Sequence, residues 1–504
     1  MLFTSIEFYI FLTAVWLVWR VVPGEWRTLV LLGGSYVVYA WWQPWFLLVL
    51  VFCTGVAFWA GLMMTRTPDG KRRKRVLAGA AVLNLLPLLF FKYLNFFNAS
   101  LGEVFLSAGW KYTPFELHIL LPVGISFYTF QAIAYCVDVY NGRIEAESRG
   151  GVFALYMAFF PKLISGPIER GAALLPQLRQ GGGGRNSGNF SGFRIGVRHD
   201  EEGRSDGDGA FFGALFESGV RLFLWGVFKK IVIADRLGMY VDMVFGDPQM
   251  MVGKTAIIGA WMFSLQIYCD FSAYMDMAIG CGRMFGFELS RNFNFPYMAR
   301  SVREFWRRWH ITLTSWFRDY VYIPLGGRRV ATGRWVLNIM AVFLLSGLWH
   351  GAGWTFIFWG GLHGLFYLAG KFSEPWRDGL RNRLGVRGKV VAVWQGLFTF
   401  QLVTLAWVFF RAKTIGDAFG LIRNMGVHLD LPVRMLSSQF STALAFGFAL
   451  VFVGIELVTY WADRKGVDVL RAVPAAVRYP GYAMGLVVMA LFGVSSNQFI
   501  YCQF

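Results

Sequence analysis

The sequence predicts an all-α, polytopic membrane protein with about eleven transmembrane helices and one or two re-entrant helices. Of its 504 residues, 56% are hydrophobic and only 15% are charged, whereas an average soluble domain carries about 25% charged residues. The mean hydropathy is +0.48. The 21 Trp and 20 Tyr residues suit a protein that lines two water–lipid interfaces, where such amphipathic rings accumulate.

The net charge of +18 does not indicate nucleic-acid binding. The basic residues cluster in short connections between apolar segments, where the positive-inside rule places them. The five cysteines are scattered and form no CxxC pair, so we expect small core residues rather than a disulfide framework.

The first apolar segments are expected to cross the membrane in turn. The N-terminus is apolar from Met1 to Val22 but contains Glu7 and no basic n-region, which predicts a first span rather than a cleaved signal peptide. The dense basic run Lys71–Arg75 places its loop in the cytoplasm and the N-terminus outside. The expected spans of this half are residues 2–22, 28–42, 44–64, 76–97 and 115–140.

The apolar segment Gly151–Gly166 is short and ends in a Pro-Lys-Leu-Ile-Ser-Gly-Pro sequence. Arg143 precedes it and Arg170 follows it, so both flanks favour the cytoplasm. A re-entrant hairpin satisfies both flanks. Because non-helical backbone at membrane depth is tolerated only beside protein or a cavity, this segment predicts an internal cavity.

Residues 180–209 form a glycine-rich insert of mixed charge that lacks the apolar content to fold. We expect a flexible cytoplasmic loop, with a solvated His199 that has no role. The basic block 283–334 is also expected in the cytoplasm. The expected apolar segments of this half are residues 211–234, 252–279, 335–349, 354–369, 390–410, 441–461 and 482–494.

Three of the six histidines fall in one window, Ser301–Gly364. Its first part shows apolar residues at intervals of three and four, which predicts a single amphipathic helix through Tyr320. Arg303, Arg307 and His310 share another face of that helix. One interpretation is an interfacial helix whose basic residues face lipid phosphates. The other is a basic, histidine-bearing wall that receives a phosphate-rich cofactor.

His350 follows an almost wholly apolar run and precedes the break Gly351-Ala352-Gly353. An ionisable side chain at membrane depth is costly and is therefore a functional candidate. A buried neutral imidazole can remove a proton from an attacking hydroxyl, although a packing residue bonded to backbone is the alternative. His363, thirteen residues later, could reach the same site or cap it.

Other chemistries have weaker support. There is no HExxH motif, and no carboxylate stands at ligand spacing from these histidines, so no metal site is expected. The GxSxG elbow of serine hydrolases is also missing. The aspartates within or beside the apolar segments could orient the histidines or form structural pairs with arginines; they are Asp138, Asp270, Asp276 and Asp319.

The pairing of Arg307-Arg308-Trp309-His310 with Leu348-Trp349-His350-Gly351, forty positions on, resembles the membrane-bound O-acyltransferase family. The resemblance is strongest to its bacterial branch, which acts in alginate O-acetylation and in D-alanine transfer to teichoic acid. The insert at 180–209 and residues 372–490 match poorly. The supporting stretches are residues 35–42, 92–97, 122–131, 160–169, 228–235, 268–274 and 499–504.

This resemblance implies one domain over residues 1–504, a ring of helices around a central tunnel, and a location in the bacterial inner membrane. It implies that His350 is the essential catalytic residue and that His310 is a second one. It also implies an acyl thioester donor on the cytoplasmic side, with acetyl-CoA expected as a substrate rather than a tightly bound cofactor. Arg303 and Arg307 are the expected donor-binding residues.

The implied acceptor is a cell-envelope polysaccharide such as alginate, or a hydroxyl on a periplasmic or membrane-anchored partner that passes the acetyl group on. Two alternatives stay open. One is a non-catalytic transport or assembly subunit of a polysaccharide export complex, which the lack of internal repeats and in-membrane acidic pairs disfavours. The other is direct cytoplasmic acylation of a lipid or protein.

Overall fold

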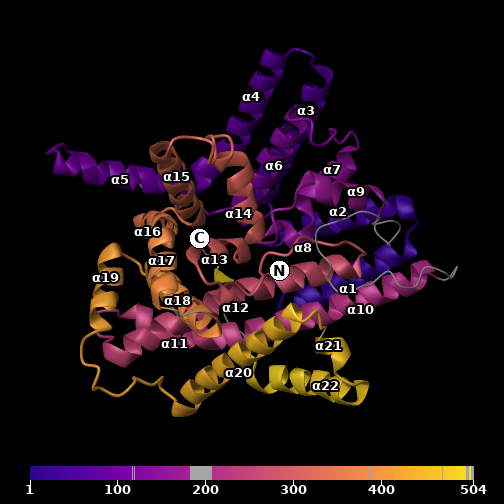
Figure 1. Ribbon diagram of the computed structural model, residues 1–504. Coiled ribbons are helices and arrows are strands. Elements are labelled where there is room, and N and C mark those ends of the chain that lie inside the picture. Colours follow the sequence, from indigo (N-terminus) through magenta and orange to yellow (C-terminus); the bar gives the residue numbers. More distant parts are fainter. Residues whose placement is uncertain are drawn as a thin grey trace. The chain divides into compact units, whose positions relative to one another are not determined.

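The computed structural model describes residues 1–115, 117, 120–181, 207–384, 388–467, 469–494 and 499–500. Within these residues the chain is helical and contains no strand (Figure 1), which confirms the predicted all-α class. The elements in chain order are α1 (Ile6–Val21), α2 (Gly24–Ala40), α3 (Phe46–Arg66), α4 (Gly70–Leu88), η1 (Leu89–Tyr93), α5 (Leu94–Ser107), α6 (Ile125–Tyr140), α7 (Gly150–Ala158), α8 (Phe160–Leu163), α9 (Gly171–Arg179), α10 (Gly207–Phe228), η2 (Lys229–Ala234), α11 (Asp235–Gly246), α12 (Gly253–Met284), η3 (Pro296–Met298), α13 (Val302–Arg308), α14 (Ile311–Phe317), η4 (Arg318–Tyr322), α15 (Thr332–His350), α16 (Trp354–Phe372), α17 (Glu374–Leu384), α18 (Lys389–Arg411), α19 (Ile415–Asn424), α20 (Gln439–Arg464), α21 (Val469–Ala472) and α22 (Ala475–Phe492).

Six helical segments among the described residues are long and apolar enough to cross a membrane. They confirm a multi-pass membrane protein, whereas the count of about eleven spans stays a prediction. The segments are Phe46–Arg66, Gly70–Ser107, Thr332–His350, Lys389–Arg411, Gln439–Arg464 and Ala475–Phe492.

The predicted helix over residues 115–140 is wrong in its first part, because α6 begins only at Ile125. Gly124 lies immediately before it in the left-handed region, with φ +78°. A Cβ at this position would overlap the carbonyl oxygen of Leu163. A residue held there cannot continue an α-helix, so the helix starts after it.

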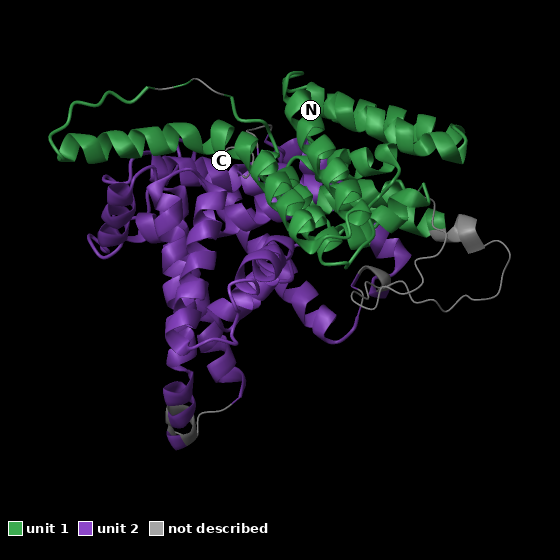
Figure 2. Cartoon of the chain, turned by 90° about the horizontal axis from the view of Figure 1, so that it is seen from above, with its two compact units in different colours: residues 1–224, 274–291 green, residues 225–273, 292–504 purple. Residues whose placement is uncertain are grey.

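Contacts divide the described chain into two compact units, shown in different colours in Figure 2. Unit 1 contains residues 1–224 and 274–291, and unit 2 contains residues 225–273 and 292–504. The predicted flexible insert at 180–209, with His199, lies outside the described residues except at its two ends.

In unit 1, the apolar segment 151–166 is interrupted, whereas its re-entrant path and the internal cavity stay predictions. The chain forms two short helices there, α7 and α8, separated at Phe159. The buried Lys162 ammonium donates to Gln131 Oε1 (2.5 Å) and to the Met157 carbonyl (3.4 Å). A side chain of the same segment therefore satisfies one backbone carbonyl beside the helix break.

In unit 2, a buried ion pair joins η2 to α12. Lys230 Nζ lies 2.8 Å from Asp235 Oδ1 and 2.7 Å from Asp270 Oδ1. The other oxygen of Asp270 accepts the Ile500 N–H at 2.7 Å. A buried charge is tolerated only when it is paired, so this pair fixes the position of α12. Phe271 follows Asp270 on α12, and its ring contacts that of His310 in the candidate site.

Candidate active site

The predicted single helix from Ser301 to Tyr320 is wrong, because the chain breaks at Trp309 and His310. Helix α13 ends at Arg308, and α14 starts at Ile311. Trp309 is extended (φ −102°, ψ 130°), and His310 lies in the left-handed region (φ 44°, ψ 56°). A bulky residue with positive φ is uncommon and needs support from its surroundings.

A short extended segment around Asn292 supplies that support. The Asn292 carbonyl accepts the Ile311 N–H at 2.9 Å, and its side-chain Oδ1 accepts the Thr312 N–H at 2.9 Å and the Thr312 hydroxyl at 2.8 Å. Two residues on, the Asn294 N–H donates to the Arg308 carbonyl at 2.9 Å. These bonds hold the chain on both sides of His310 in place, and we call this arrangement the asparagine bracket.

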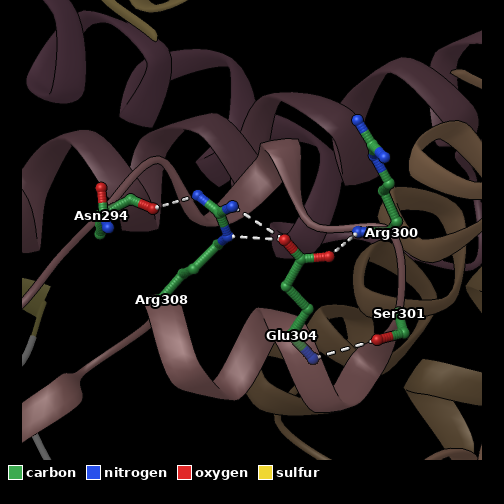
Figure 3. A network of polar contacts seen from close by, with 5 residues as sticks. All are labelled: Asn294, Arg300, Ser301, Glu304 and Arg308. Atoms are coloured by element: carbon green, nitrogen blue, oxygen red, sulfur yellow. Dashed lines mark hydrogen bonds and ion pairs between the residues drawn. The ribbon is translucent and has the colours of Figure 1, made fainter. Parts of the chain in front are cut away.

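Helix α13 is only seven residues long, and a polar network fixes its ends (Figure 3). At its start the Glu304 N–H donates to Ser301 Oγ at 3.1 Å, and the Glu304 carboxylate accepts the Arg300 N–H at 2.8 Å. At its end Arg308 donates to the same carboxylate at 2.8 Å and to the Asn294 carbonyl at 3.1 Å. Although partial burial opposes ionisation, these hydrogen bonds hold the pKa of Glu304 below its usual value.

Arg303 and Arg307 are exposed and lie four residues apart on α13. They share a face that differs from the face of Glu304 and Arg308. Beside the Glu304 network lies a polar pocket of about 330 Å³, whose lining residues include Arg300, Tyr460 and Arg464.

His310 is fully buried rather than on the exposed face that the periodicity predicts. Its Nδ1 lies 3.4 Å from Asn292 Oδ1. That oxygen already accepts the Thr312 N–H, so it is the oxygen of the amide, and the imidazole proton belongs on Nδ1. Burial lowers the pKa of His310 to about 3, which makes the ring neutral with a lone pair on Nε2.

Helices α15 and α16 form a tight antiparallel hairpin (Figure 1). A Cβ on Gly347 would overlap the Phe356 carbonyl oxygen, and a Cβ on Gly360 would overlap that of Phe343 and lie 3.2 Å from the Gly347 Cα. Small residues allow this close backbone approach in membrane helix pairs. At 19 residues, α15 is longer than the predicted segment of about fifteen, and its length of about 28 Å suffices for a bilayer core.

His350 is the last residue of α15 and is 3% exposed. Its ring centroid lies 4.8 Å from that of Trp349, 5.0 Å from that of Trp359 and 6.4 Å from that of His310. The structure therefore brings the two predicted catalytic histidines together. They lie in a buried aromatic cluster of unit 2.

His363 also belongs to this cluster, which the sequence left undecided. Its buried ring lies 5.0 Å from that of Trp359, and its Nδ1 accepts the Trp306 indole N–H at 3.3 Å. Sequence reasoning missed Asn292, Trp306 and Trp359 as members of the site. The high aromatic content is the only signal for the two tryptophans, and Asn292 has none, because each acts through a partner that is distant along the chain.

The structure assigns three of the four candidate aspartates to ion pairs. Asp138 lies 3.0 Å from Arg143, Asp270 pairs with Lys230, and Asp319 lies 2.7 Å from Arg318. They therefore fit the structural role. Among the described residues, no three His, Cys, Asp or Glu side chains gather closely enough to hold a metal ion.

Comparison with known proteins gives one family. The model of the membrane-bound O-acyltransferase family matches residues 152–412. The chain is 39% identical over 430 residues to the probable alginate O-acetylase of Pseudomonas aeruginosa, covering 84% of this chain and 75% of that protein. It is 34% identical over 431 residues to the peptidoglycan O-acetyltransferase of Helicobacter pylori (80% and 73%) and 24% identical over 348 residues to the teichoic acid D-alanyltransferase of Bacillus subtilis (67% and 78%).

Proposed function

The chain belongs to the membrane-bound O-acyltransferase family, and from this we propose that it transfers an acetyl group from cytoplasmic acetyl-CoA toward hydroxyls of an extracytoplasmic polysaccharide. The observation that carries the proposal is the buried pair His310–His350, whose ring centroids lie 6.4 Å apart although the residues are forty positions apart. Two imidazoles so close in an apolar cluster are costly without a task.

In the proposed reaction, His350 acts as general base. It takes the proton of the acceptor hydroxyl as the hydroxyl oxygen attacks the carbonyl carbon of the thioester. The carbon–sulfur bond then breaks, the acceptor keeps the acetyl group as an ester, and the leaving sulfur receives the proton from His350. A transient acyl group on His350 itself is the alternative route.

His310 is proposed to orient the reacting groups. Its Nδ1 proton faces Asn292 Oδ1, so Nε2 can only accept a hydrogen bond while the ring is neutral. Nε2 of His310 can therefore accept a hydrogen bond from an N–H or hydroxyl group of the acyl donor. It cannot polarise the thioester carbonyl, because that would require a proton on Nε2.

Arg303 and Arg307 are proposed to bind the phosphates of acetyl-CoA. Both are exposed on one face of α13, and guanidinium groups bind phosphate in a bidentate manner. The pocket beside the same helix offers three arginines and an aromatic ring, together with the carboxylates of Glu304 and Asp463; its basic and aromatic residues are Arg300, Arg308, Arg464 and Tyr460. These features support the binding of an anionic acyl donor such as acetyl-CoA at α13.

The acceptor is proposed to be a cell-envelope polysaccharide, reached directly or through a periplasmic or membrane-anchored protein that carries the acetyl group onward. Two of the relatives are named for the O-acetylation of alginate and of peptidoglycan. Both are extracytoplasmic polysaccharides, which supports an acceptor hydroxyl outside the cytoplasm and a location in the inner membrane.

Replacement of His350 tests the proposal. In proteoliposomes with labelled acetyl-CoA, His350→Ala should lower acetyl transfer about 10²–10⁴-fold, the usual cost of losing a general base. The exposed His428 provides the control, and His428→Asn should keep the wild-type rate. Activity of His350→Ala above about a tenth of wild type contradicts the assigned role. Wild-type protein that releases no acetyl group would favour a non-catalytic transport subunit.

The donor site is tested separately. Replacing Arg303 and Arg307 together by Gln should raise the KM for acetyl-CoA about tenfold or more, because each lost charged hydrogen bond weakens binding. Arg72 and Arg75 are exposed in the basic run before the fourth helix's apolar part, and their double Gln variant should leave this KM unchanged. Equal KM values for both double variants would exclude the α13 arginines as the donor site.

A further inference from the structure

His363 has no task in the proposed reaction, although it is as fully buried as His310. Its side chain is fully buried on α16. The rings of Trp359 and Trp306 lie 5.0 and 5.1 Å from it, and the Phe305 ring stacks on it at 6.2 Å with an interplanar angle of 8°. A polar ring in such apolar surroundings calls for an explanation.

One hydrogen bond defines the protonation state of His363. The Trp306 indole N–H donates to Nδ1 of His363 at 3.3 Å. An indole N–H can only donate, so Nδ1 must be the unprotonated nitrogen and the single ring proton must lie on Nε2. An imidazolium would turn an N–H toward the indole N–H and break the bond. His363 is therefore held neutral and is not available as a base at Nδ1.

The ring of Trp359 joins His363 to the proposed catalytic residue, His350. Its Nε2 has no hydrogen-bond partner within the described part of the chain. The Trp359 ring, one helical turn earlier, stands at 72° to the His363 ring, and the same Trp359 ring meets His350 at 5.0 Å and 89°. His363, Trp359 and His350 thus form a series of perpendicular ring contacts in which the tilt of one ring restricts the next.

Through its Nδ1 atom, His363 contacts Trp306 on α13. Trp306 lies between the exposed Arg303 and Arg307 on that helix, and its ring is itself buried against Trp359 at 5.8 Å. The indole–imidazole hydrogen bond is therefore a polar link between α13, which carries the arginines, and α16, which carries Trp359.

We propose that His363 is a positioning residue, which accepts the Trp306 hydrogen bond and through Trp359 holds the His350 ring in its reactive orientation. The inference rests on the proposed function, because it assigns to His350 the reaction described above. Its consequence is that the Nδ1 acceptor of His363 matters for turnover, whereas its Nε2–H does not contact substrate.

Three replacements of His363 separate its two nitrogens. His363→Asn keeps an acceptor at the Nδ1 position, His363→Gln places an amide at the Nε2 position, and His363→Phe keeps only the ring. We expect Asn to retain most of the wild-type kcat. Gln and Phe should lower kcat about tenfold, the rate equivalent of one lost hydrogen bond, with the KM for acetyl-CoA unchanged.

Trp306→Phe removes the donor of the same bond and should also lower kcat about tenfold. The double variant Trp306→Phe, His363→Phe should be no slower than either single variant, because both remove one shared interaction. Trp335 provides the matched control, since its indole N–H donates to the Tyr322 hydroxyl at 3.1 Å, and Trp335→Phe should keep the wild-type kcat.

Several outcomes would overturn the inference. If His363→Gln keeps the wild-type kcat and His363→Asn does not, Nε2 contacts substrate. If all three His363 variants lose about 10²–10⁴-fold and the acid limb of the pH–rate profile shifts, His363 is the base. If all keep the wild-type kcat, His363 only packs. Should the His363 variants fail to fold, equal kcat values for Trp306→Phe and Trp335→Phe would also refute it. Failure of the proposed function is seen independently, as full activity of His350→Ala.

Discussion

The α13–α14 segment and the α15–α16 hairpin each bring one histidine to the same site, but different forces hold them. His310 sits in a left-handed conformation that the asparagine bracket and the Glu304–Arg308 network maintain through directional hydrogen bonds. His350 ends a regular helix that is held by backbone contact at Gly347 and Gly360 and by aromatic rings. The conformation of the α13–α14 segment depends on individual hydrogen bonds. The α15–α16 hairpin depends on close packing of small and aromatic residues.

Because different forces hold His310 and His350, the two histidines should respond to different perturbations. Hydrogen bonds to charged groups respond to pH and to the loss of one atom. Close-packed helices respond to added volume, since interiors near crystal density have little room to absorb it. Each substitution below is expected to affect one of the two segments and to leave the other unchanged.

The largest effect is expected for Gly360→Ala. The new methyl group would overlap the Phe343 carbonyl oxygen, so α15 and α16 must separate, and the free energy of unfolding in detergent should fall by about 3 kcal/mol. Gly361 is the matched control, because the nearest atom to a Cβ there is Leu344 Cδ2 at 3.5 Å. Gly361→Ala should be neutral or stabilising in a helix. Equal stability of the two variants would show that the helices are not in backbone contact.

A smaller effect, with a diagnostic sign, is expected at His310. Both His310→Ala and His310→Gly lose the packing of the ring, but Gly adopts φ +44° without strain. We expect His310→Gly to be more stable than His310→Ala by about 1 kcal/mol in chemical unfolding. At Thr314, inside α14, the order should reverse, with Ala more stable than Gly by about 1 kcal/mol. If the Ala variant were more stable than the Gly variant at both positions, the prediction of a single continuous helix would be correct.

The smallest effect is the pH dependence of the Glu304 network. The pKa of Glu304 is lowered from 4.5 in the folded protein, so its stabilisation is present above about pH 4.5 and is lost as the pH falls through the folded pKa. Glu304→Gln should therefore cost about 1 kcal/mol of unfolding free energy at pH 7 and less at pH 4. Glu217, whose side chain is 60% exposed in its pair with Arg221, is the control, and Glu217→Gln should show a smaller difference between the two pH values. A pH-independent cost at Glu304 would contradict the network.

The sequence predicted those parts of the fold that depend on neighbouring residues. The apolar legs that meet at Gly351 and the shared helix face of Arg303 and Arg307 both follow from composition and periodicity. The convergence of His310 and His350 followed only from the family resemblance, because no periodic signal reaches across forty residues.

The features that sequence reasoning missed depend on distant partners. A stripe at intervals of three and four continues through Trp309 and His310, yet the backbone breaks there because Asn292, eighteen residues earlier, offers better hydrogen bonds than a continued helix. The tautomer of His363 depends on Trp306, 57 residues earlier. Local propensity competes with such tertiary contacts and loses at both positions.

The contact between Gly347 and Gly360 has a consequence for genetics. Each glycine faces the backbone of the other helix, and the Gly360 Cβ position lies 3.2 Å from the Gly347 Cα. A larger residue on one side cannot be compensated by a smaller one on the other, since both positions already carry the smallest residue. Loss-of-function alleles at this pair should therefore lack second-site suppressors within the pair, and any that arise should map to residues that let the two helices move apart.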